Sequence, residues 1–451
     1  MMRSLYSGVA GLKTHQTRMD VIGNNIANVN TTAYKSQSMT FSDLMYQTTQ
    51  AASGANPTTG VGGINARQIG LGAKTSAIKT AITTQGASQT TNDPFDIMIT
   101  GDSFFIVNNG QNNYFTRDGS FYVDGAGNLA MTSTGYNVMG WKVDPNDASA
   151  IKQDTVSALR IMTTENMTYP PEATKSARIS GIIDKNDTNV NAAAGKIMNL
   201  EFYDNQGYKY TAKLSVHSTT TDGTFTVQLD DILDSKGKTV LADKTKASLQ
   251  QNNTNVTAPV LEFDLKNGSF KNVGTAGGTE STLTLHFDTG TFPSFTDITI
   301  DFSKCSNLNN NGSSTVSPIR GDAKGNGAGR KVGEMSGIEI QKDGMIYANY
   351  DNGCSRLLGQ IAVATFANAS GLAKEGDNLY SATQNSGDFD GIGKDITTGG
   401  GYMNTGVLEM SNVDLSSEFT EMITTQRGFQ ANSRIITVSD TLLEELTNLK
   451  R

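Results

Sequence analysis

The stretch Met19–Ser36, MDVIGNNIANVNTTAYKS, decides how the rest of the chain is understood. Its first residues continue an apolar pattern with helical spacing, and asparagines then accumulate at positions 24, 25, 28 and 30. Asparagine side chains compete with the helical backbone for hydrogen bonds, and asparagine tolerates the left-handed conformation in which many helices end. The stretch therefore predicts that a first helix ends near residue 28, before any globular domain has begun.

Upstream of this point, apolar residues follow a coiled-coil spacing, with steps that alternate between three and four residues. The predicted N-terminal seam comprises Leu5, Val9, Leu12, Gln16, Met19, Ile22 and Ile26. Ser4 is a candidate cap for the start of this helix. The spacing therefore predicts a helix with one narrow apolar stripe.

The last part of the chain carries the same pattern, and Asp414 or Ser416 can cap the start of a second helix. The predicted C-terminal seam comprises Leu415, Phe419, Met422, Gln426, Phe429, Ser433, Ile436, Leu442, Leu446 and Leu449, and Ile435 belongs to its second phase. A helix with one narrow apolar stripe is marginal in water by itself. We therefore expect the two terminal helices to pair with each other, rather than each packing on a domain of its own. Polar seam positions suit helices that contact further partners in an assembly.

Between the two ends the sequence reads as β structure. Short alternating runs are separated by Asp-Gly, Asn-Gly and Gly-Asn pairs, which favour hairpin turns. The sequence thus predicts a multidomain, mainly β protein with α-helical coiled-coil termini and nested antiparallel β domains. The predicted parts are a terminal helical domain (1–28 with 415–451), an extended connecting segment (29–72 with 403–414), a β-rich inner or middle domain (73–143 with 333–402) and an inserted β-rich outer domain (144–332).

Composition and motifs exclude several classes of function. The net charge of −8 argues against a nucleic-acid partner, and no run approaches the roughly 20 apolar residues of a membrane span. The three histidines are His15, His217 and His286, and none has the spacing of a metal site. We therefore expect no catalytic, cofactor-binding or metal-binding residues, and no enzyme. Cys305 and Cys354 are expected to be free thiols, although one disulfide between them was an alternative.

Three long segments in this order resemble the bacterial flagellar axial proteins of the rod and hook. They are the N-terminal residues 1–36, the stretch TGDSFFIV followed by YFTRDGSFYVDGAGNLAMTSTGYNVMGW within 100–141, and the C-terminal residues 406–451. Within that family, the large insertion at 144–332 favours the hook members, because the rod members are expected to be shorter.

The resemblance implies a structural subunit that polymerises into a curved, flexible tube, acting as a universal joint that transmits motor torque to the filament and encloses the export channel. The implied partners are further copies of the chain, the rod, the hook–filament junction proteins, the hook cap and the type III export apparatus. The implied location is the extracellular hook of the flagellum, reached without a cleaved signal peptide. Asn24, Asn25 and Asn28 are expected to contact neighbouring subunits, or else to form a solvated helix end.

Two other functions remain open at this point. The Gly-rich segment from Gln47 to Leu71 keeps a distal rod protein as an alternative, because that protein also has an extended segment in this region. A secreted β-rich adhesin or glycan-binding module is the second alternative. Its ligand surface would lie on the inserted domain, but the aromatic residues there fall in alternating strands and are expected to pack in the core or across strands. These residues are Phe202, Tyr203, Tyr208 and Tyr210.

Overall fold

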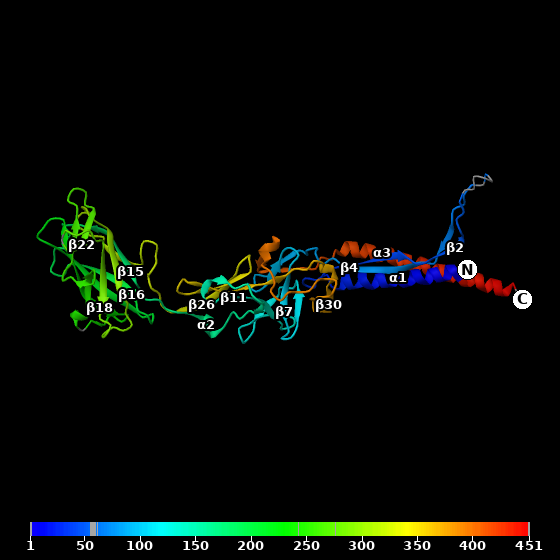
Figure 1. Ribbon diagram of the computed structural model, residues 1–451, viewed down its shortest axis with the longest axis horizontal. Coiled ribbons are helices and arrows are strands. Elements are labelled where there is room, and N and C mark those ends of the chain that lie inside the picture. Colours follow the sequence, from blue (N-terminus) through cyan, green and yellow to red (C-terminus); the bar gives the residue numbers. More distant parts are fainter. Residues whose placement is uncertain (1, 55–59, 61, 242, 276, 450–451) are drawn as a thin grey trace. The chain divides into compact units, whose positions relative to one another are not determined.

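The computed structural model describes residues 2–54, 60, 62–241, 243–275 and 277–449 (Figure 1). Residues 1 and 450–451, at the two ends of the predicted helical domain, lie outside the described residues. The same holds for 55–59 and 61 of the predicted connecting segment and for 242 and 276 of the predicted outer domain. The chain forms two compact units. Unit 1 lies within 1–163, 338–348 and 356–451, and unit 2 comprises 164–337 and 349–355. The predicted fold class, mainly β with paired terminal helices, is confirmed.

The two long helices of unit 1 are α1 (Met2–Ala27) and α3 (Leu415–Asn448), and they lie side by side (Figure 1). The carboxylate of Asp414 caps α3 by accepting the N–H of Ser416 at 2.9 Å. The prediction that Ser4 caps the first helix is wrong, because α1 already begins at Met2 and includes Ser4.

Two antiparallel ribbons follow α1. The strands β1 (Gln37–Asp43) and β4 (Ala73–Thr80) pair with each other and pack against α1. The strands β2 (Tyr46–Gln50) and β3 (Arg67–Gly70) extend this ribbon, and every one of their residues is exposed. The predicted extended segment 29–72 therefore contains the ribbon of β2 and β3, whereas its strand β1 pairs with β4, which lies in the part predicted as the middle domain.

The β body of unit 1 is built around β7, in which four consecutive residues are buried. Its sheet strands are β7 (Phe104–Asn108), β8 (Asn113–Thr116), β9 (Phe121–Val123), β10 (Leu129–Met131), β11 (Asn137–Asp144), β12 (Asp147–Ile151), β13 (Ser157–Ala158), β28 (Ser355–Ile361), β29 (Val363–Ala364), β30 (Ala373–Gly376) and β31 (Leu379–Ser381). Hydrophobic clusters occupy both faces of β7, since Phe105 belongs to one cluster and Phe104 to another. This burial on both faces explains why the run reads as continuously apolar.

The C-terminal segment completes two small sheets of unit 1. The strand β32 (Met403–Thr405) pairs with β6 (Ile97–Ile99), and β33 (Val407–Glu409) pairs with β5 (Ser88–Thr90). Residues from opposite ends of the sequence are therefore joined by backbone hydrogen bonds. The strands β26 (Gly333–Ile340) and β27 (Met345–Tyr350) each belong partly to unit 1 and partly to unit 2.

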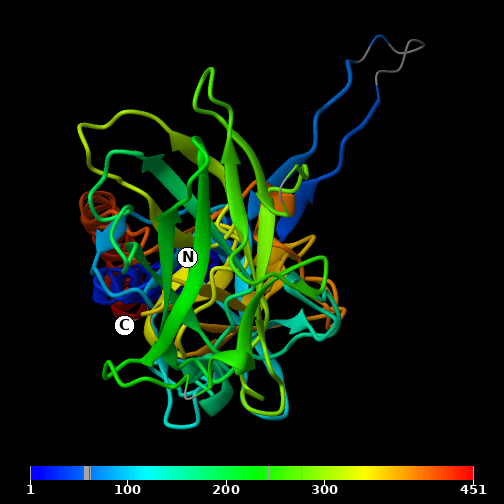
Figure 2. The ribbon, with the colours of Figure 1, turned by 90° about the vertical axis from the view of Figure 1, so that its left-hand side faces the viewer.

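Unit 2 is a β-sandwich whose strands face the viewer in Figure 2. One sheet contains β15 (Ser176–Ile183), β19 (Ala247–Gln251), β20 (Thr254–Asn255), β23 (Thr282–Phe287), β24 (Ile298–Asn307) and β25 (Ser317–Arg320). The other contains β16 (Lys196–Tyr203), β17 (Lys209–Ser218), β18 (Thr224–Asp234), β21 (Val260–Phe263) and β22 (Phe270–Gly274). Before the sandwich lie α2 (Thr164–Met167) and β14 (Thr168–Tyr169), the latter paired with β26.

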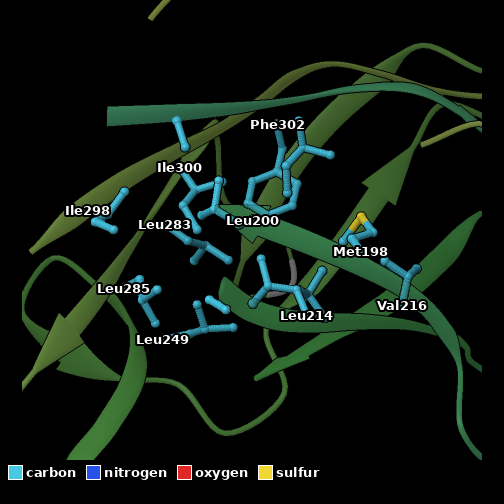
Figure 3. Close-up of a cluster of buried hydrophobic side chains, with 14 of the residues drawn as sticks. Met198, Leu200, Leu214, Val216, Leu249, Leu283, Leu285, Ile298, Ile300 and Phe302 are labelled. Carbon is cyan, nitrogen blue, oxygen red and sulfur yellow. The ribbon is translucent and has the colours of Figure 1, made fainter. Parts of the chain in front are cut away.

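The core of unit 2 lies between its two sheets. Alternate side chains of β16 and β17 point toward those of β19, β23 and β24, as Figure 3 shows for Leu200, Leu214 and Leu283. One pairing differs from the antiparallel expectation, because β15 runs parallel to β24. Hairpin turns reveal only local neighbours, whereas this pair joins strands far apart in the sequence. Cys305, at the end of β24, is a buried free thiol, and Cys354 is also free and buried.

The aromatic residues predicted to pack inside unit 2 offer a matched pair for a stability test. Phe202 is fully buried against Tyr210 and Phe287, as predicted. The same prediction is wrong for Tyr208, which precedes β17 and is 64% exposed. We expect Phe202→Ala to lower the free energy of unfolding of unit 2 by about 3–5 kcal/mol, because it leaves a cavity in the core. Tyr208→Ala is the control and should change this free energy by less than about 0.5 kcal/mol. Denaturant titration of the two variants measures the difference, and equal effects would contradict the assignment of Phe202 to the core.

Candidate functional site: the helix pair and its junction with the β body

The interface between α1 and α3 is built from small and polar residues. A side chain at Gly11 would place its Cβ atom 2.7 Å from the Asn432 amide, and one at Gly428 would lie 2.7 Å from the His15 ring. These two glycines therefore allow the helices to approach closely. On α3, Thr425 and Ser439 are the buried residues, and Asn432 lies midway between them at heptad spacing.

The predicted N-terminal seam is only partly in this interface. Ile22 is buried, Leu5, Leu12, Met19 and Ile26 are half-buried, and Val9 and Gln16 are exposed. Of the predicted C-terminal seam, Met422, Phe429, Ser433 and Ile436 are half-buried, whereas Leu415, Phe419, Gln426, Leu442, Leu446 and Leu449 are exposed. The helices thus pair as predicted, and the two predicted seams lie in this interface only in part. Ile436 is one member that does, because a Cβ atom at Gly8 of α1 would lie 3.4 Å from its side chain. The small residues Gly11, Thr425 and Ser439 could have indicated another part of the contact face, but a search for apolar residues does not detect them.

The exposed residues of α3 form a second face, which we call the α3 apolar stripe. It consists of Ile435, Val438, Leu442, Leu446 and Leu449, which are spaced three or four residues apart and each have more than a third of their surface exposed. After Leu449, Val438 is the most exposed of these residues, with 57% of its surface exposed. Leu415, Phe419 and Ile423 are also exposed, but they lie on another side of the helix. Within one chain, this stripe therefore has little to pack against.

The asparagine stretch ends α1 through contacts inside the chain. The Asn25 amide donates to the Gln37 carbonyl at 2.8 Å and to Glu418 Oε1 at 2.9 Å. Its oxygen accepts the Gln37 N–H at 2.9 Å and the Tyr34 hydroxyl at 3.3 Å. A side-chain amide has two N–H donors and two acceptor lone pairs, so Asn25 is saturated. The expectation that Asn25 contacts a neighbouring subunit is therefore wrong, since it ties α1 to β1 and α3.

The other two asparagines form a local helix end. Asn28 donates to the Asn24 carbonyl at 2.9 Å and to the Asn24 side-chain oxygen at 2.8 Å, and its own oxygen accepts the Thr31 hydroxyl. Asn24 is exposed and Asn28 is half-buried. Their predicted contact with neighbouring subunits stays a prediction.

A buried ionic cluster lies where the helix pair joins the β body. The Lys35 ammonium lies 2.6 Å from Glu409 Oε1, and the Arg117 guanidinium lies 3.6 Å from Glu409 Oε2. All three side chains are at most 1% exposed. We refer to Lys35, Arg117 and Glu409 as the Glu409 cluster. Buried charges are costly unless they are paired and hydrogen-bonded, so each depends on the others.

Backbone and amide groups complete the junction. Glu409 Oε1 also accepts the Gly86 N–H at 2.9 Å, and the Lys35 ammonium donates to the Thr84 carbonyl at 2.7 Å. Asn412 accepts the Ser36 N–H at 2.7 Å and donates to the Thr84 carbonyl at 3.1 Å. A Cβ atom at Gly86 would lie 1.9 Å from the Met410 carbonyl oxygen, so only glycine fits there. Sequence reasoning missed this junction, because its members are scattered over the chain and form no motif.

Burial shifts the titration of these groups. It lowers the pKa of Lys35 and of Arg117, and the Glu409 carboxylate opposes both shifts. In the helix interface, burial raises the pKa of Glu418, while burial and the Arg18 charge lower the pKa of His15. The interface between the helices therefore disfavours charge, except where Arg18 pairs with Glu421 at 3.0 Å near the surface.

Other chemistry has little support in the part of the chain that the structure describes. There, no group of three or more His, Cys, Asp or Glu residues is arranged to hold a metal ion. Among the same residues, no helix is both long enough and apolar enough to cross a membrane. His286 forms a half-exposed pair with Asp297 at 2.8 Å, and His217 lies 3.0 Å from Ser215.

Asn25 and Asn24 provide a matched test of the helix junction. We expect Asn25→Ala to destabilise the docking of α1 by about 1–3 kcal/mol, because it removes the side-chain partner of the half-buried Gln37 N–H and carbonyl. Asn24→Ala should have a smaller effect, since this side chain is exposed. Hydrogen exchange of the α1 amides reports the docking. Equal protection in both variants would contradict the role given to Asn25.

Comparisons with known proteins agree with this architecture. Three family models match the chain: "Flagella basal body rod protein" over residues 5–35, "Flagellar hook protein FlgE/F/G D1 domain" over 98–180 and "Flagellar basal body rod FlgEFG protein C-terminal" over 404–449. These segments contain α1 with Lys35, the β body with Arg117, and Glu409 with α3.

Full-length relatives carry two names. The flagellar hook protein FlgE of Borreliella burgdorferi is 36% identical, with 100% of each chain covered. The flagellar basal-body rod protein FlgG of Bacillus subtilis is 30% identical, also with 100% of each chain covered. A solved structure, the Helicobacter pylori flagellar hook protein FlgE2, is 16% identical with a TM-score of 0.41, covering 71% of this chain and 100% of that one. The matches over the whole chain show that this protein belongs to the family of flagellar rod and hook proteins that includes the hook protein FlgE.

Proposed function

We propose that this chain is the structural subunit of the flagellar hook. In this proposal, many copies polymerise into a curved, flexible tube that transmits motor torque to the filament and encloses the export channel. The observation that carries it is the α3 apolar stripe, which one chain leaves exposed. Membership of the hook and rod family supports the same conclusion.

The stripe supports a helical assembly for a physical reason. Exposed apolar side chains in a row on one helix are unfavourable in water and mark a contact with another molecule. The N-terminal turns of α1 carry three further exposed apolar residues, Met2, Tyr6 and Val9. Helices from neighbouring copies are the natural partners for such stripes. The predicted N-terminal and C-terminal seams thus remain our proposal for the assembly contacts, with their exposed members facing other copies.

The ribbon of β2 and β3 supplies a second argument. Its residues make few contacts within the chain, and Met45, Tyr46 and Ile69 are exposed. An isolated two-stranded ribbon is marginal in water. We propose that neighbouring copies cover it in the polymer. The four predicted parts then correspond to an inner helical layer, a connecting layer, a middle β layer and an outer β domain.

The remaining parts of the proposal follow from the family. We propose contacts with the rod, the hook–filament junction proteins and the hook cap, and delivery by the type III export apparatus without a cleaved signal peptide. The subunit would be extracellular, in the hook, and its role would be structural rather than enzymatic.

The distal rod is the second candidate, and a specific observation favours it. The Bacillus subtilis relative that carries a rod name matches this chain along its whole length. This match by itself does not decide between the two functions. Electron micrographs of tubes assembled from the purified chain do separate them, because a hook subunit should form curved tubes and a rod subunit straight ones.

Val438 and Leu442 test the α3 apolar stripe directly. We expect Val438→Asp or Leu442→Asp to abolish tube formation while leaving the β body folded, because burying an unpaired carboxylate at a subunit contact costs several kcal/mol. Sedimentation and electron microscopy measure the polymer, and circular dichroism measures the fold.

The matched control introduces the same charge elsewhere on α3. Thr437 is exposed and polar, and it lies five positions before Leu442, which is about 140° around the helix, so it faces a different direction. Thr437→Asp should assemble as the unmodified chain does. Normal tubes from Val438→Asp and Leu442→Asp would overturn the proposed role of the stripe.

A further inference from the structure

The Glu409 cluster joins parts of the chain that are far apart in sequence. Lys35 and Glu409 are separated by 374 positions, and their charged atoms lie 2.6 Å apart. Arg117 comes from the β body, at the residue that follows β8. The cluster is therefore complete only when the first, middle and last parts of unit 1 are all present.

The C-terminal segment from residue 403 to residue 412 also supplies the backbone partners of the same region. Glu409 accepts the Ala33 N–H with its carbonyl at 2.8 Å, and Met410 donates to the Ala87 carbonyl at 2.8 Å. The strands β32 and β33 pair with β6 and β5. Without this segment, the edges of β5 and β6 lose these hydrogen bonds.

The charge balance makes premature closure costly. Two buried cations, Lys35 and Arg117, face one carboxylate, and both cationic side chains are fully covered. If the region around Lys35 closed before Glu409 arrived, the Lys35 ammonium would lose its ion-pair partner. Removing one partner of a buried ion pair strongly destabilises the folded state. The Lys35 side chain is then better solvated in an open chain.

We propose that Glu409 is a folding checkpoint: the junction of unit 1 around Lys35 and Arg117 closes only when the C-terminal segment docks. The cluster acts here as a condition on the order of folding, beyond its contribution to stability. The biological use of this checkpoint rests on the proposed function. A subunit that passes through a narrow export channel has to stay unfolded there, and unit 1 stays open until the C-terminal segment has left the channel. Unit 2 has its own core and is free of this condition.

Refolding of the full-length chain from denaturant tests the order. Pulsed hydrogen exchange with mass spectrometry follows the amides of 81–90, of 403–412 and of unit 2. We expect 81–90 and 403–412 to become protected in one kinetic phase, with unit 2 following its own rate. Protection of 81–90 before 403–412 would overturn the proposal.

A substitution in the folded, full-length chain tests the role of the charge. Glu409→Gln keeps the shape of the side chain, removes the ion-pair partner of Lys35, and leaves Arg117 with Asp102 as its remaining carboxylate. We expect the amides of 81–90 to exchange roughly 100- to 1,000-fold faster, together with those of 403–412. Glu201→Gln in unit 2 is the control, because its partner Lys209, at 2.7 Å, is half-exposed. This control should change exchange less than about fivefold.

A second variant covers the case in which Glu409→Gln prevents unit 1 from folding. Lys35→Met combined with Glu409→Gln removes one of the stranded cations and should recover part of the lost protection, by about tenfold or more. No recovery would overturn the electrostatic basis of the checkpoint.

These measurements use single chains at concentrations where no tubes form, so the outcome is independent of assembly. A chain that refolds in the expected order but never forms tubes would overturn the proposed function and leave the checkpoint standing. A chain that forms tubes but protects 81–90 before 403–412 would overturn the checkpoint and leave the proposed function standing.

Discussion

Burial of the Glu409 carboxylate between Lys35 and Arg117 is the constraint on which the arrangement of unit 1 depends. A charged group removed from water needs an opposite charge and hydrogen bonds, so the C-terminal segment has to run beside the segment that follows α1. Because α1 ends shortly before Lys35 and α3 begins shortly after Glu409, this one contact also places the two helices side by side.

The helices then meet through glycine, threonine, serine and asparagine as well as through apolar side chains such as Ile436, which lies next to Gly8. Gly11 and Gly428 allow a close approach, and Asn25 bonds to Glu418 where the helices meet β1. Apolar side chains are consequently left on the outer face of α3. The same geometry that holds the ends of one chain together thus leaves the surface with which other chains can pack.

Local signals in the sequence predicted much of the fold. The asparagine cluster correctly placed the end of α1, and turn pairs revealed nested β structure, because both depend on residues that are neighbours in sequence. The face by which α1 and α3 meet was predicted only in part, since Ile22 and Ile436 lie in it and Val9 and Leu442 do not. The apolar spacing that includes Val9 and Leu442 predicts a contact surface, but it does not show whether the contact is with the same chain or with another chain. The Glu409 cluster and the parallel pairing of β15 with β24 were also missed, since both join residues that only the folded chain brings together.

Unit 2 begins and ends at neighbouring positions. The strand β14 pairs with β26, and Glu172 and Arg330 form a further bridge just inside this pair. Because the insertion closes on itself, residues between these points can be replaced by another domain with adjacent ends, provided the bridge is kept. Unit 2 is therefore a part of the chain in which size and surface can change while the helix pair and its junction stay the same.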